Sequence, residues 1–571
     1  MDPLSELQDD VTLEDTNQSL SQLKLASLDD KNWPADEVPV FPKSEDTNCS
    51  PEPITHLRWD DPYYDIARHQ IVEVAAQGGD DAEWPESVYY EGKCGSGVEE
   101  VNLSMTLGCM QRQQIKELCT SYAPMFSATP GLTERAYHSV DTGNAHPIKV
   151  QPYRVSPQAK TAIEREIQDM LQMGVIHPSE SAWASPVVLV PKPDGEIRFC
   201  VDYRKLNAVT RPDNYPMPRT DELLEKLGRA QFISTLDLTK GYWQVPLDES
   251  AKKRSAFTTH LGLYEFNVLP FGLRNAPATF QRLVDGLLAG LGEYAVAYLD
   301  DVAIFLDSWA DHLEHLQKVL ERIREAGLTV KAKKCQIGLN RVTYLGHQVG
   351  QGTISPLQAK VDAIQKWPVP KSKKQVQSFL GLAGYYRRFV PHYSQIAAPL
   401  TDLTKKKQPN AVQWTEKCQK AFNKLKATLM SDPVLRAPDF DKPFLVATDA
   451  SKCGVGAVLM QKGPDQEFQP VVFLGKKLSE RESNWSVTEK ECYAIVYALE
   501  KLRPYVWGRR FHLQTDHAAL KWLHTIKETN KKLLRWSLAL QDFDFDIQHI
   551  SGASNKVADA LSHESFPEST G

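Results

Sequence analysis

The chain has 571 residues, of which 42% are hydrophobic and 24% charged. This length exceeds what one hydrophobic core organises, so three or more domains are expected. The sequence holds no run of about 18 apolar residues, and its acidic start lacks an apolar stretch, so neither a membrane span nor a secretory signal is predicted. Nine scattered cysteines without a CxxC pair favour a reducing compartment over a disulfide framework or zinc ribbon. We therefore expect an intracellular protein, cytoplasmic or nuclear, that is not secreted.

The net charge of -7 conceals an asymmetry along the chain. Residues 1–100 contain 24 acidic and 6 basic residues, whereas the remaining 471 contain 49 acidic and 60 basic ones. A basic body is typical of a protein that binds polyanions, although a merely solvated surface fits the charge alone equally well. Residues 1 to about 105 are rich in Asp, Glu, Ser and Pro with weak periodicity, so we predict disorder there.

Regular structure is predicted from a helix over Met110–Tyr122 onward. Ser156-Pro157 reads as an N-cap followed by a first-turn proline, and a helix with apolar helical spacing follows. Two apolar runs around Pro-Asp-Gly predict a β-hairpin at Val187–Tyr203. Further on we predict helices and strands in alternation, with the bounds 220–227 (helix), 232–238 (strand), 278–288 (helix), 295–299 and 302–306 (strands), 311–326 (helix) and 328–330 (strand). The alternation with antiparallel hairpins predicts an α+β domain with a ferredoxin-like sheet.

The C-terminal part of the chain divides into a helical segment and a second α/β unit. Residues 355–430 are predicted to be mainly helical, with a loop at Lys405–Pro409. After Pro443 three strands are expected at 444–449, 455–460 and 471–474. A long helix over 488–502, a strand over 511–515 and two helical stretches complete this unit.

Three aspartates in the first α/β domain lie where strands end. Asp300 and Asp301 sit between two apolar strands, and Asp237 ends another apolar strand. Adjacent carboxylates at a hairpin tip repel each other, which a cation would relieve. Three converging carboxylates suit two Mg²⁺ ions that activate a 3′-hydroxyl and stabilise a leaving pyrophosphate.

Four long sequence motifs surround these aspartates in order: SPVVLVPKPDGEIRFCVDYRKLN (185–207), LDLTKGYWQVPL (236–247), LPFGLRNAPATFQR (269–282) and YLDD (298–301). Together they resemble the reverse transcriptase of gypsy-class LTR retrotransposons, and the resemblance runs from about residue 110 to about 563. It implies a multidomain α+β protein: a right-hand polymerase with fingers, ferredoxin-like palm and thumb/connection, followed by an RNase H-like α/β domain. We place the N-terminal segment at 1–108, fingers and palm at 109–350, thumb/connection at 351–440, the RNase H-like domain at 441–563 and a disordered tail at 564–571.

The resemblance implies roles for individual residues of the polymerase. Asp237, Asp300 and Asp301 match the metal-binding triad of the palm. Lys192 and Arg198 flank the hairpin turn that contacts the incoming triphosphate. Tyr242 matches the aromatic residue that blocks a ribose 2′-hydroxyl, and Phe271 and Gly272 match further residues of the nucleotide site. Gypsy elements usually carry phenylalanine at the position of Phe271, where retroviruses have glutamine. The primer and template contacts correspond to Tyr344, Leu345, Gly346, Arg387 and Arg388.

A second set of carboxylates matches the RNase H fold. Its motifs are DASKCGVGAVLMQ (449–461), TEKECYAIVYAL (488–499), TDHAALKWL (515–523) and NKVADALSH (555–563). The resemblance implies that two Mg²⁺, or Mn²⁺ in its place, activate water against an RNA phosphodiester. The implied ligands are Asp449, Glu491, Asp516 and Asp559. Glu482 and Glu489 are alternatives to Glu491, and His549 is a lesser candidate for assisting product release. We expect His517 to be structural or substrate-orienting.

The implied function is RNA- and DNA-directed DNA synthesis coupled to RNA cleavage in hybrids. Its partners are an RNA template, a DNA primer, the RNA–DNA hybrid and deoxynucleoside triphosphates, and the oligomeric state stays open. A domesticated or decayed copy that only binds nucleic acid is the alternative, as is an interaction protein whose acidic segment recruits partners. The triplet Asp141-Thr142-Gly143 spells an aspartic protease motif without its apolar continuation, and His312 and His315 lack further zinc ligands.

Overall fold

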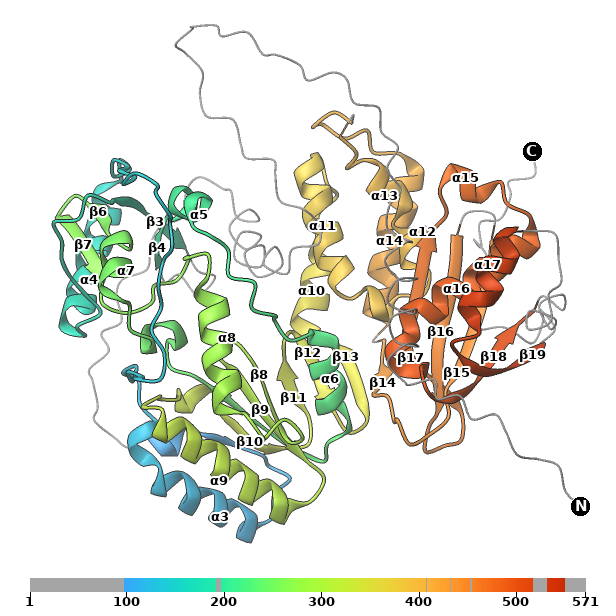
Figure 1. Ribbon diagram of the computed structural model, residues 1–571, viewed down its shortest axis with the longest axis horizontal. Helices are drawn as coiled ribbons and strands as arrows, with labels where there is room; N and C mark the ends of the chain where they lie inside the picture. Colours follow the sequence, from blue (N-terminus) through green and yellow to red (C-terminus); the bar gives the residue numbers. More distant parts are fainter. Residues whose placement is uncertain are drawn as a thin grey trace, which may run out of the picture. The chain divides into compact units, whose positions relative to one another are not determined.

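The computed structural model describes residues 97–191, 197–406, 408–431, 433–451, 454–516 and 531–549 (Figure 1). The predicted site residues Lys192, His517 and Asp559 lie outside these ranges, as does the acidic segment before residue 97. In the described part of the chain, no helix has the length and apolar composition needed to cross a membrane.

The fingers contain a five-stranded sheet in the order β2-β7-β6-β3-β4. Its strands are β2 (Ile176–Pro178), β3 (Ser185–Pro191), β4 (Ile197–Val201), β6 (Phe257–Thr259) and β7 (Gly262–Phe266), with the short helices α5 (Arg204–Val209) and α7 (Glu249–Arg254) nearby. The sheet packs against α4 (Pro157–Gln172), whose N-cap Ser156 accepts a hydrogen bond at its hydroxyl from the Ala159 amide. The predicted cap and the predicted β3–β4 hairpin are therefore confirmed.

The palm sheet has the order β1-β10-β5-β9-β8. Its strands are β1 (Asn102–Leu103), β5 (Phe232–Asp237), β8 (Ala295–Tyr298), β9 (Asp301–Leu306) and β10 (Gln336–Leu339). Side chains alternate along β9: Val302 and Ile304 enter one hydrophobic core and Ala303 and Phe305 enter another. This period of two shows that both faces of the sheet are buried.

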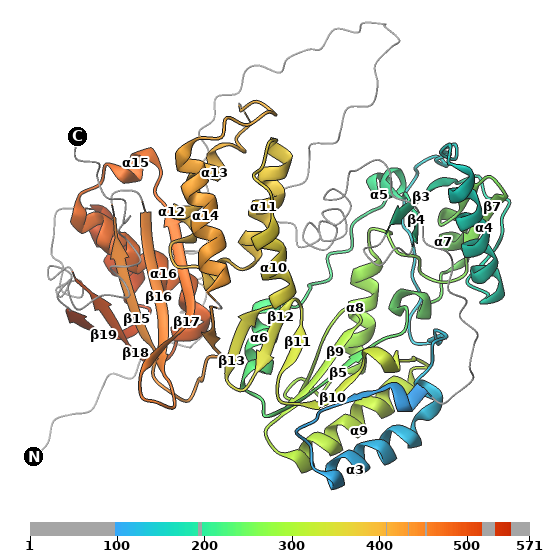
Figure 2. The ribbon, with the colours of Figure 1, turned by 180° about the vertical axis from the view of Figure 1, so that it is seen from behind.

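Helices cover both faces of the palm sheet. The first core includes residues of α3 (Cys109–Ser121), α8 (Ala276–Leu287) and α9 (Trp309–Glu325), and both ribbon views show α3 and α9 side by side (Figures 1 and 2). The second core includes α6 (Thr220–Arg229) and a further sheet, β11-β12-β13-β14. Its strands are β11 (Val342–Tyr344), β12 (His347–Gly350), β13 (Thr353–Pro356) and β14 (Leu435–Arg436). The boundary predicted at residue 350, between the palm and the thumb/connection, falls inside the β12–β13 hairpin.

The segment after β13 is helical, as predicted. It contains α10 (Gln358–Lys366), α11 (Lys373–Tyr385), α12 (Tyr393–Ile396), α13 (Ala398–Asp402) and α14 (Glu416–Met430). Ser372 caps α11 through a capping box with Gln375, a local signal for where this helix begins.

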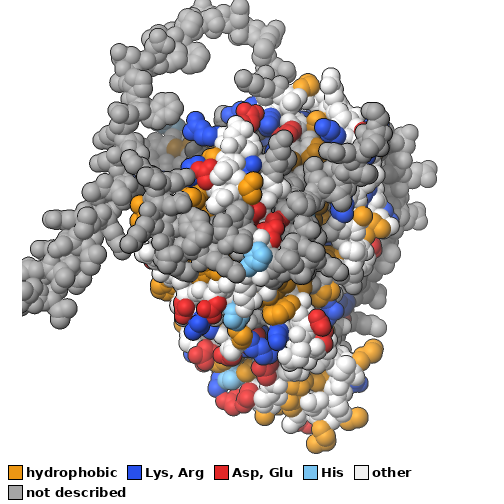
Figure 3. All heavy atoms as spheres, turned by 90° about the vertical axis from the view of Figure 1, so that its right-hand side faces the viewer, with side chains coloured by type: hydrophobic (Ala, Val, Ile, Leu, Met, Phe, Trp, Pro, Cys, Tyr) orange, Lys and Arg blue, Asp and Glu red, His pale blue; other side chains and the backbone are white. Residues whose placement is uncertain are grey.

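The C-terminal sheet has the order β17-β16-β15-β18-β19, with β15, β18 and β19 parallel and β16 and β17 antiparallel. Its strands are β15 (Leu445–Ala450), β16 (Gly454–Lys462), β17 (Phe468–Lys477), β18 (Arg510–Thr515) and β19 (Asp544–His549). The helices are α15 (Glu480–Ser483), α16 (Val487–Val506) and α17 (Lys531–Leu540). On the described part of the face toward the right of Figure 1, acidic and basic side chains are interspersed (Figure 3).

The structure differs from the predicted elements in two places. The strand expected at 328–330 is reduced to bridges of Val330 with Phe126 and Leu238. The strand β19 over Asp544–His549, which pairs in parallel with β18, was not predicted. Phe545 and Ile547 alternate with polar residues there, which is a strand pattern that the sequence contains.

Candidate functional sites

The palm aspartates lie at the end of one strand and at the start of its neighbour. Asp237 is the last residue of β5 and Asp301 the first of β9, and the two are register partners in the antiparallel ladder. Asp300 precedes Asp301 in the β8–β9 turn, and its carbonyl accepts a hydrogen bond of 3.1 Å from the Leu238 amide. The fold therefore brings the three predicted residues to one edge of the sheet.

The turn that carries Asp300 is held by a glutamine that sequence reasoning missed. Leu299 has a left-handed backbone (φ 56°), which non-glycine residues adopt rarely. Its amide donates to Oε1 of Gln281 at 2.7 Å, while Nε2 of Gln281 donates to the Ala297 carbonyl at 3.1 Å. Gln281 is fully buried on α8. A glutamine within the apolar run of a predicted helix was the available signal.

Burial and mutual repulsion dominate the electrostatics of the palm site. Burial, with Asp300 and Asp237 close by, raises the pKa of Asp301 to about 7. Burial also raises the pKa of Asp300, and the charge of Asp237 adds to the shift. Lys334 offsets part of this repulsion, because its Nζ lies 2.8 Å from Oδ2 of Asp237. Sequence reasoning missed Lys334 as well.

An aromatic cluster adjoins the aspartates. Tyr242 on the 3-10 helix η3 (Gly241–Gln244) packs against Phe271 and Phe280, with ring centroids 5.0 Å and 5.4 Å away. Phe271 is 52% exposed. A Cβ at Gly241 would lie 3.1 Å from Cβ of Asp300, so the backbone before Tyr242 passes directly beside the acidic turn. Gly272 has φ 96°, which favours glycine. The predicted residues Tyr242, Phe271 and Gly272 are therefore neighbours.

The residues predicted for the triphosphate and the primer lie in different environments. Arg198 is exposed on β4. Tyr344 is only 2% exposed, and its hydroxyl donates to the Asp301 carbonyl at 3.1 Å, so its side chain supports the palm rather than facing a ligand. Leu345 and Gly346 form the turn between β11 and β12.

The two predicted arginines after α11 have different surroundings. Arg387 is exposed. The guanidinium of Arg388 instead donates to buried Glu225 on α6 at 2.7 Å and to the Tyr505 hydroxyl at 3.2 Å. Arg388 is therefore engaged inside the protein, contrary to the expectation that it lies on a surface open to a duplex.

The second acidic centre joins three elements of the C-terminal sheet. Asp449 on β15, Glu491 on α16 and Asp516 after β18 each offer a carboxylate oxygen, and these oxygens lie within 4.8 Å of one another. Asp449 and Glu491 are 4% exposed. These three of the four predicted carboxylates are brought together by the fold, and the fourth, Asp559, lies outside the described residues.

Glu491 is the most perturbed acid of this centre. Its Oε1 accepts a hydrogen bond from the Ala450 amide at 3.2 Å, whereas its Oε2 is buried without a hydrogen-bond partner. Burial, reinforced by Asp449 and Asp516, raises its pKa to about 9. A buried carboxylate in this setting is costly to ionise unless a cation compensates it.

The alternative acids and the histidine have other surroundings. Glu489 accepts from the Ser486 amide at the start of α16 and pairs with Lys532 at 3.1 Å. Glu482 caps α15 and pairs with Lys476. Neither belongs to the acidic cluster. Nε2 of His549 on β19 lies 3.0 Å from the Asp516 carbonyl, so the histidine borders the centre.

Other candidates have structural explanations. His312 on α9 bonds to Ser234 at 2.7 Å, and His315 stacks on Tyr294, so neither histidine takes part in a metal cluster among the described residues. Asp141 accepts from the Gly143 amide within a turn and pairs with Arg211.

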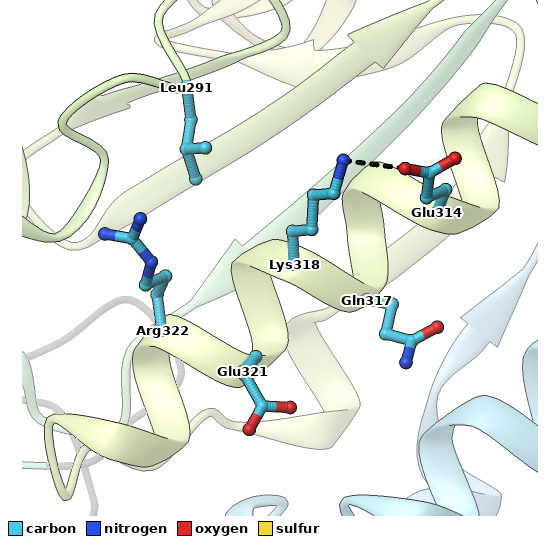
Figure 4. Close-up of a pocket in the computed structure, with 6 residues that line it drawn as sticks. All are labelled: Leu291, Glu314, Gln317, Lys318, Glu321 and Arg322. Carbon is cyan, nitrogen blue, oxygen red and sulfur yellow. Dashed lines mark hydrogen bonds and ion pairs between the residues drawn. The ribbon is translucent and has the colours of Figure 1, made fainter.

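A hollow on the outer face of α9 is lined by charged side chains that bond to one another or to neighbouring groups. Figure 4 shows Lys318 reaching Glu314, an ion pair of 2.7 Å, and Arg322 pointing toward the loop of Leu291. Glu321 accepts from the Tyr122 hydroxyl. The charged side chains of this hollow are therefore engaged with one another or with neighbouring groups, as the bond from Arg322 to the Leu287 carbonyl also shows.

Comparisons with known proteins agree with this arrangement. A family model described as reverse transcriptase (RNA-dependent DNA polymerase) matches residues 190–349, and one described as an RNase H-like domain found in reverse transcriptase matches residues 439–543. The chain is 42% identical over 442 residues to the retrovirus-related Pol polyprotein from transposon 297 of Drosophila melanogaster, covering 76% of this chain and 41% of that protein. It is 35% identical to the transposon Tf2-3 polyprotein of Schizosaccharomyces pombe, covering 73% of this chain and 31% of that protein.

Among solved structures, the foamy viral protease-reverse transcriptase in complex with dsDNA matches 82% of this chain and 99% of its own, with a TM-score of 0.72 and 25% identity. The chain spans less than half the length of both polyproteins that it matches. The order of the matched domains is the same as the order of the two acidic centres along the chain. The chain therefore carries a reverse transcriptase domain followed by an RNase H-like domain, and its relatives are Pol polyproteins of gypsy-type LTR retrotransposons.

Proposed function

We propose that the chain extends a DNA primer with deoxynucleotides on an RNA or DNA template, and that it cleaves the RNA strand of the resulting hybrid. The single observation that carries this proposal is the presence of two separate acidic centres on two separate sheets. One contains Asp237, Asp300 and Asp301, and the other contains Asp449, Glu491 and Asp516. Each centre lies within one of the two matched domains.

The donor groups of both centres fit divalent cations. The carboxylate oxygens of the second centre lie within 4.8 Å of one another, and Oε2 of Glu491 lacks a hydrogen-bond partner. Hard oxygen ligands of this kind suit Mg²⁺, and Mn²⁺ as its substitute. We propose two ions per centre, held by the palm aspartates and by Asp449, Glu491, Asp516 and Asp559. Bound there, they would supply a nucleophile at neutral pH and charge stabilisation for phosphoryl transfer.

The chain's own residues would select and orient the substrates. We assign the Tyr242 ring, which packs against Phe271 and Phe280, to the exclusion of a ribose 2′-hydroxyl, because the backbone at Gly241, directly before it, passes beside Asp300. We assign Gly272 to close backbone approach by the nucleotide and Arg198, with Lys192, to its triphosphate. Leu345, Gly346 and exposed Arg387 are assigned to the primer. Because the foamy viral relative is described in complex with dsDNA, a duplex is the proposed ligand of this chain.

The experiment that tests this function is primer extension with the unaltered chain. A labelled DNA primer on an RNA template is incubated with deoxynucleotides and Mg²⁺, and an RNA-labelled hybrid is incubated in parallel. Extension and RNA cleavage are both expected, and chelation by EDTA should abolish both. A chain that binds the hybrid but neither extends nor cleaves would instead be a decayed copy that only holds nucleic acid.

A further inference from the structure

The turn proposed to hold the primer has an unusual backbone. Tyr344 and His347 are register partners, so β11 and β12 are joined by the two residues Leu345 and Gly346. Both have positive φ, 44° and 71°. Two-residue turns of this type favour asparagine and glycine, and a leucine at the first position persists only where its surroundings hold it.

Two consecutive tyrosines at the end of α11 supply that support. The Tyr385 hydroxyl donates to the Leu345 carbonyl at 2.6 Å, and the Tyr386 hydroxyl donates to the Gly346 carbonyl at 2.7 Å. Tyr386 is 1% exposed. His347 lies within ring contact of both tyrosines, with centroids 5.2 Å and 5.3 Å away. Each carbonyl of the turn is thus bound by a hydroxyl from one helix end.

The same hairpin is tied to the palm site. Tyr344, which directly precedes the turn, donates its hydroxyl to the Asp301 carbonyl at 3.1 Å. A chain of contacts therefore runs from the end of α11, through the turn, to the backbone of a proposed metal ligand. Because these hydrogen bonds are buried or half-buried, they are stronger than they would be in water.

We propose that Tyr385 and Tyr386 are positioning residues for primer extension. By holding the Leu345-Gly346 turn at a set place relative to Asp301, they keep the terminal sugar and phosphate of the primer in line with the acidic centre. This inference rests on the proposed polymerase function. It assigns both tyrosines to orientation, without contact with the reacting atoms.

The test uses the full chain with the double substitution Tyr385→Phe and Tyr386→Phe, which removes both hydroxyls and keeps both rings. The matched control is Tyr393→Phe, because Tyr393 lies in the same segment but donates to the Leu380 carbonyl at 3.2 Å instead of the turn. Single-nucleotide extension is measured for kcat and for KM of the deoxynucleotide. A primer with 2-aminopurine at its 3′ end reports the geometry of the terminus.

A misplaced reacting group lowers the rate without loss of binding, so we expect kcat to fall about tenfold in the double variant. The KM of the deoxynucleotide and the hybrid cleavage rate should stay within about twofold, and 2-aminopurine fluorescence should change. Tyr393→Phe should match the unaltered chain in kcat, in the KM of the deoxynucleotide, in the hybrid cleavage rate and in 2-aminopurine fluorescence. Gly346→Ala, which strains the turn at φ 71°, should reproduce the fall in kcat.

The outcomes separate this inference from the function on which it rests. If the unaltered chain fails to extend a primer, both are refuted. If it extends and the double variant has the kcat and fluorescence of Tyr393→Phe, only the positioning role is refuted. If the double variant also loses hybrid cleavage and has a lower melting temperature, the two hydroxyls have a structural role in the whole chain. The single variant Tyr385→Phe is then measured, and a normal kcat in that variant would overturn the inference.

Discussion

Nζ of Lys334 lies 2.8 Å from Oδ2 of Asp237, so the palm site contains a cation of the protein itself. The lysine belongs to a short 3-10 helix (Ala332–Lys334) that precedes β10. Asp301 nevertheless has a raised pKa of about 7. One ammonium therefore relieves the repulsion among three carboxylates only in part.

Substituting Lys334 should make the palm site depend more on divalent cations. For Lys334→Met we expect the metal-free chain to lose no more than about 1 kcal/mol of stability at pH 8, because the lysine side chain is more than half exposed. The gain in melting temperature on adding Mg²⁺ should grow, since bound cations stabilise the folded state. Thermal melting with and without Mg²⁺ measures both quantities.

Lys333→Met is the matched control, because this neighbour pairs with Glu100 at 3.3 Å, outside the acidic cluster. Lys333→Met should leave the gain in melting temperature on adding Mg²⁺ unchanged. Equal effects of the two substitutions would show that Lys334 does not act as a counter-ion of the site.

The second acidic centre predicts a pH-dependent stability. The folded pKa of Glu491 is about 9 against an ordinary 4.5, so the folded state keeps a proton that the unfolded state releases. Stability should therefore fall as pH rises from about 4.5 toward 9. Mg²⁺ should raise the melting temperature more at pH 8.5 than at pH 6. A gain that is the same at both pH values would contradict the raised pKa.

Glu491→Gln should separate stability from activity at that centre. Glutamine cannot ionise in either state, so the unfolded variant gains no stability from ionisation; at pH 8.5 without metal we therefore expect the variant to be more stable than the unaltered chain, and by more than at pH 6. Hybrid cleavage should be abolished, because a proposed metal ligand is lost. Melting and cleavage assays test this. A destabilised variant that still cleaves the hybrid would refute the role of Glu491.

Arg388 should matter for stability rather than for nucleic-acid binding. Arg388→Met leaves Glu225, which is 8% exposed, without its cationic partner, and breaking such a buried pair costs about 3–5 kcal/mol. The midpoint of denaturant unfolding should fall accordingly. Arg135→Met, which breaks an exposed pair with Glu325, should cost less than about 1 kcal/mol.

Salt dependence distinguishes the two arginines of this segment. For exposed Arg387→Met, the slope of log affinity for a template–primer against log salt should weaken by about 1. Arg388→Met should leave the slope unchanged. The reverse pattern would restore Arg388 as a contact to the duplex.

The elements around the palm aspartates were predictable because each aspartate borders a run of apolar residues with strand period. Asp237, Asp301 and Asp449 all occupy strand ends that the sequence marks. Strand β1 was not predictable, since it has two residues and pairs with β10, Asn102 opposite Gln336. Its existence depends on a partner more than 200 residues away, which no local pattern reports.

The supporting residues of the sites were harder to predict for the same reason. A run of basic residues does not reveal which of its cations will be engaged inside the protein. Arg388 is engaged there because it binds Glu225, which lies 163 residues earlier in the chain. Lys334 meets Asp237 only through the pairing of β10 with β5. Motifs therefore predicted the acids, whereas the fold was needed to find Gln281, Lys334 and Tyr385.

The independence of the two centres is tested most directly by one pair of variants in a coupled assay. A doubly labelled template–primer reports DNA extension and RNA cleavage in the same tube with Mg²⁺, for Asp300→Asn and for Asp449→Asn. We expect Asp300→Asn to stop extension and to spare cleavage of a preformed hybrid, and Asp449→Asn to do the reverse. Loss of both activities from either substitution would contradict this independence.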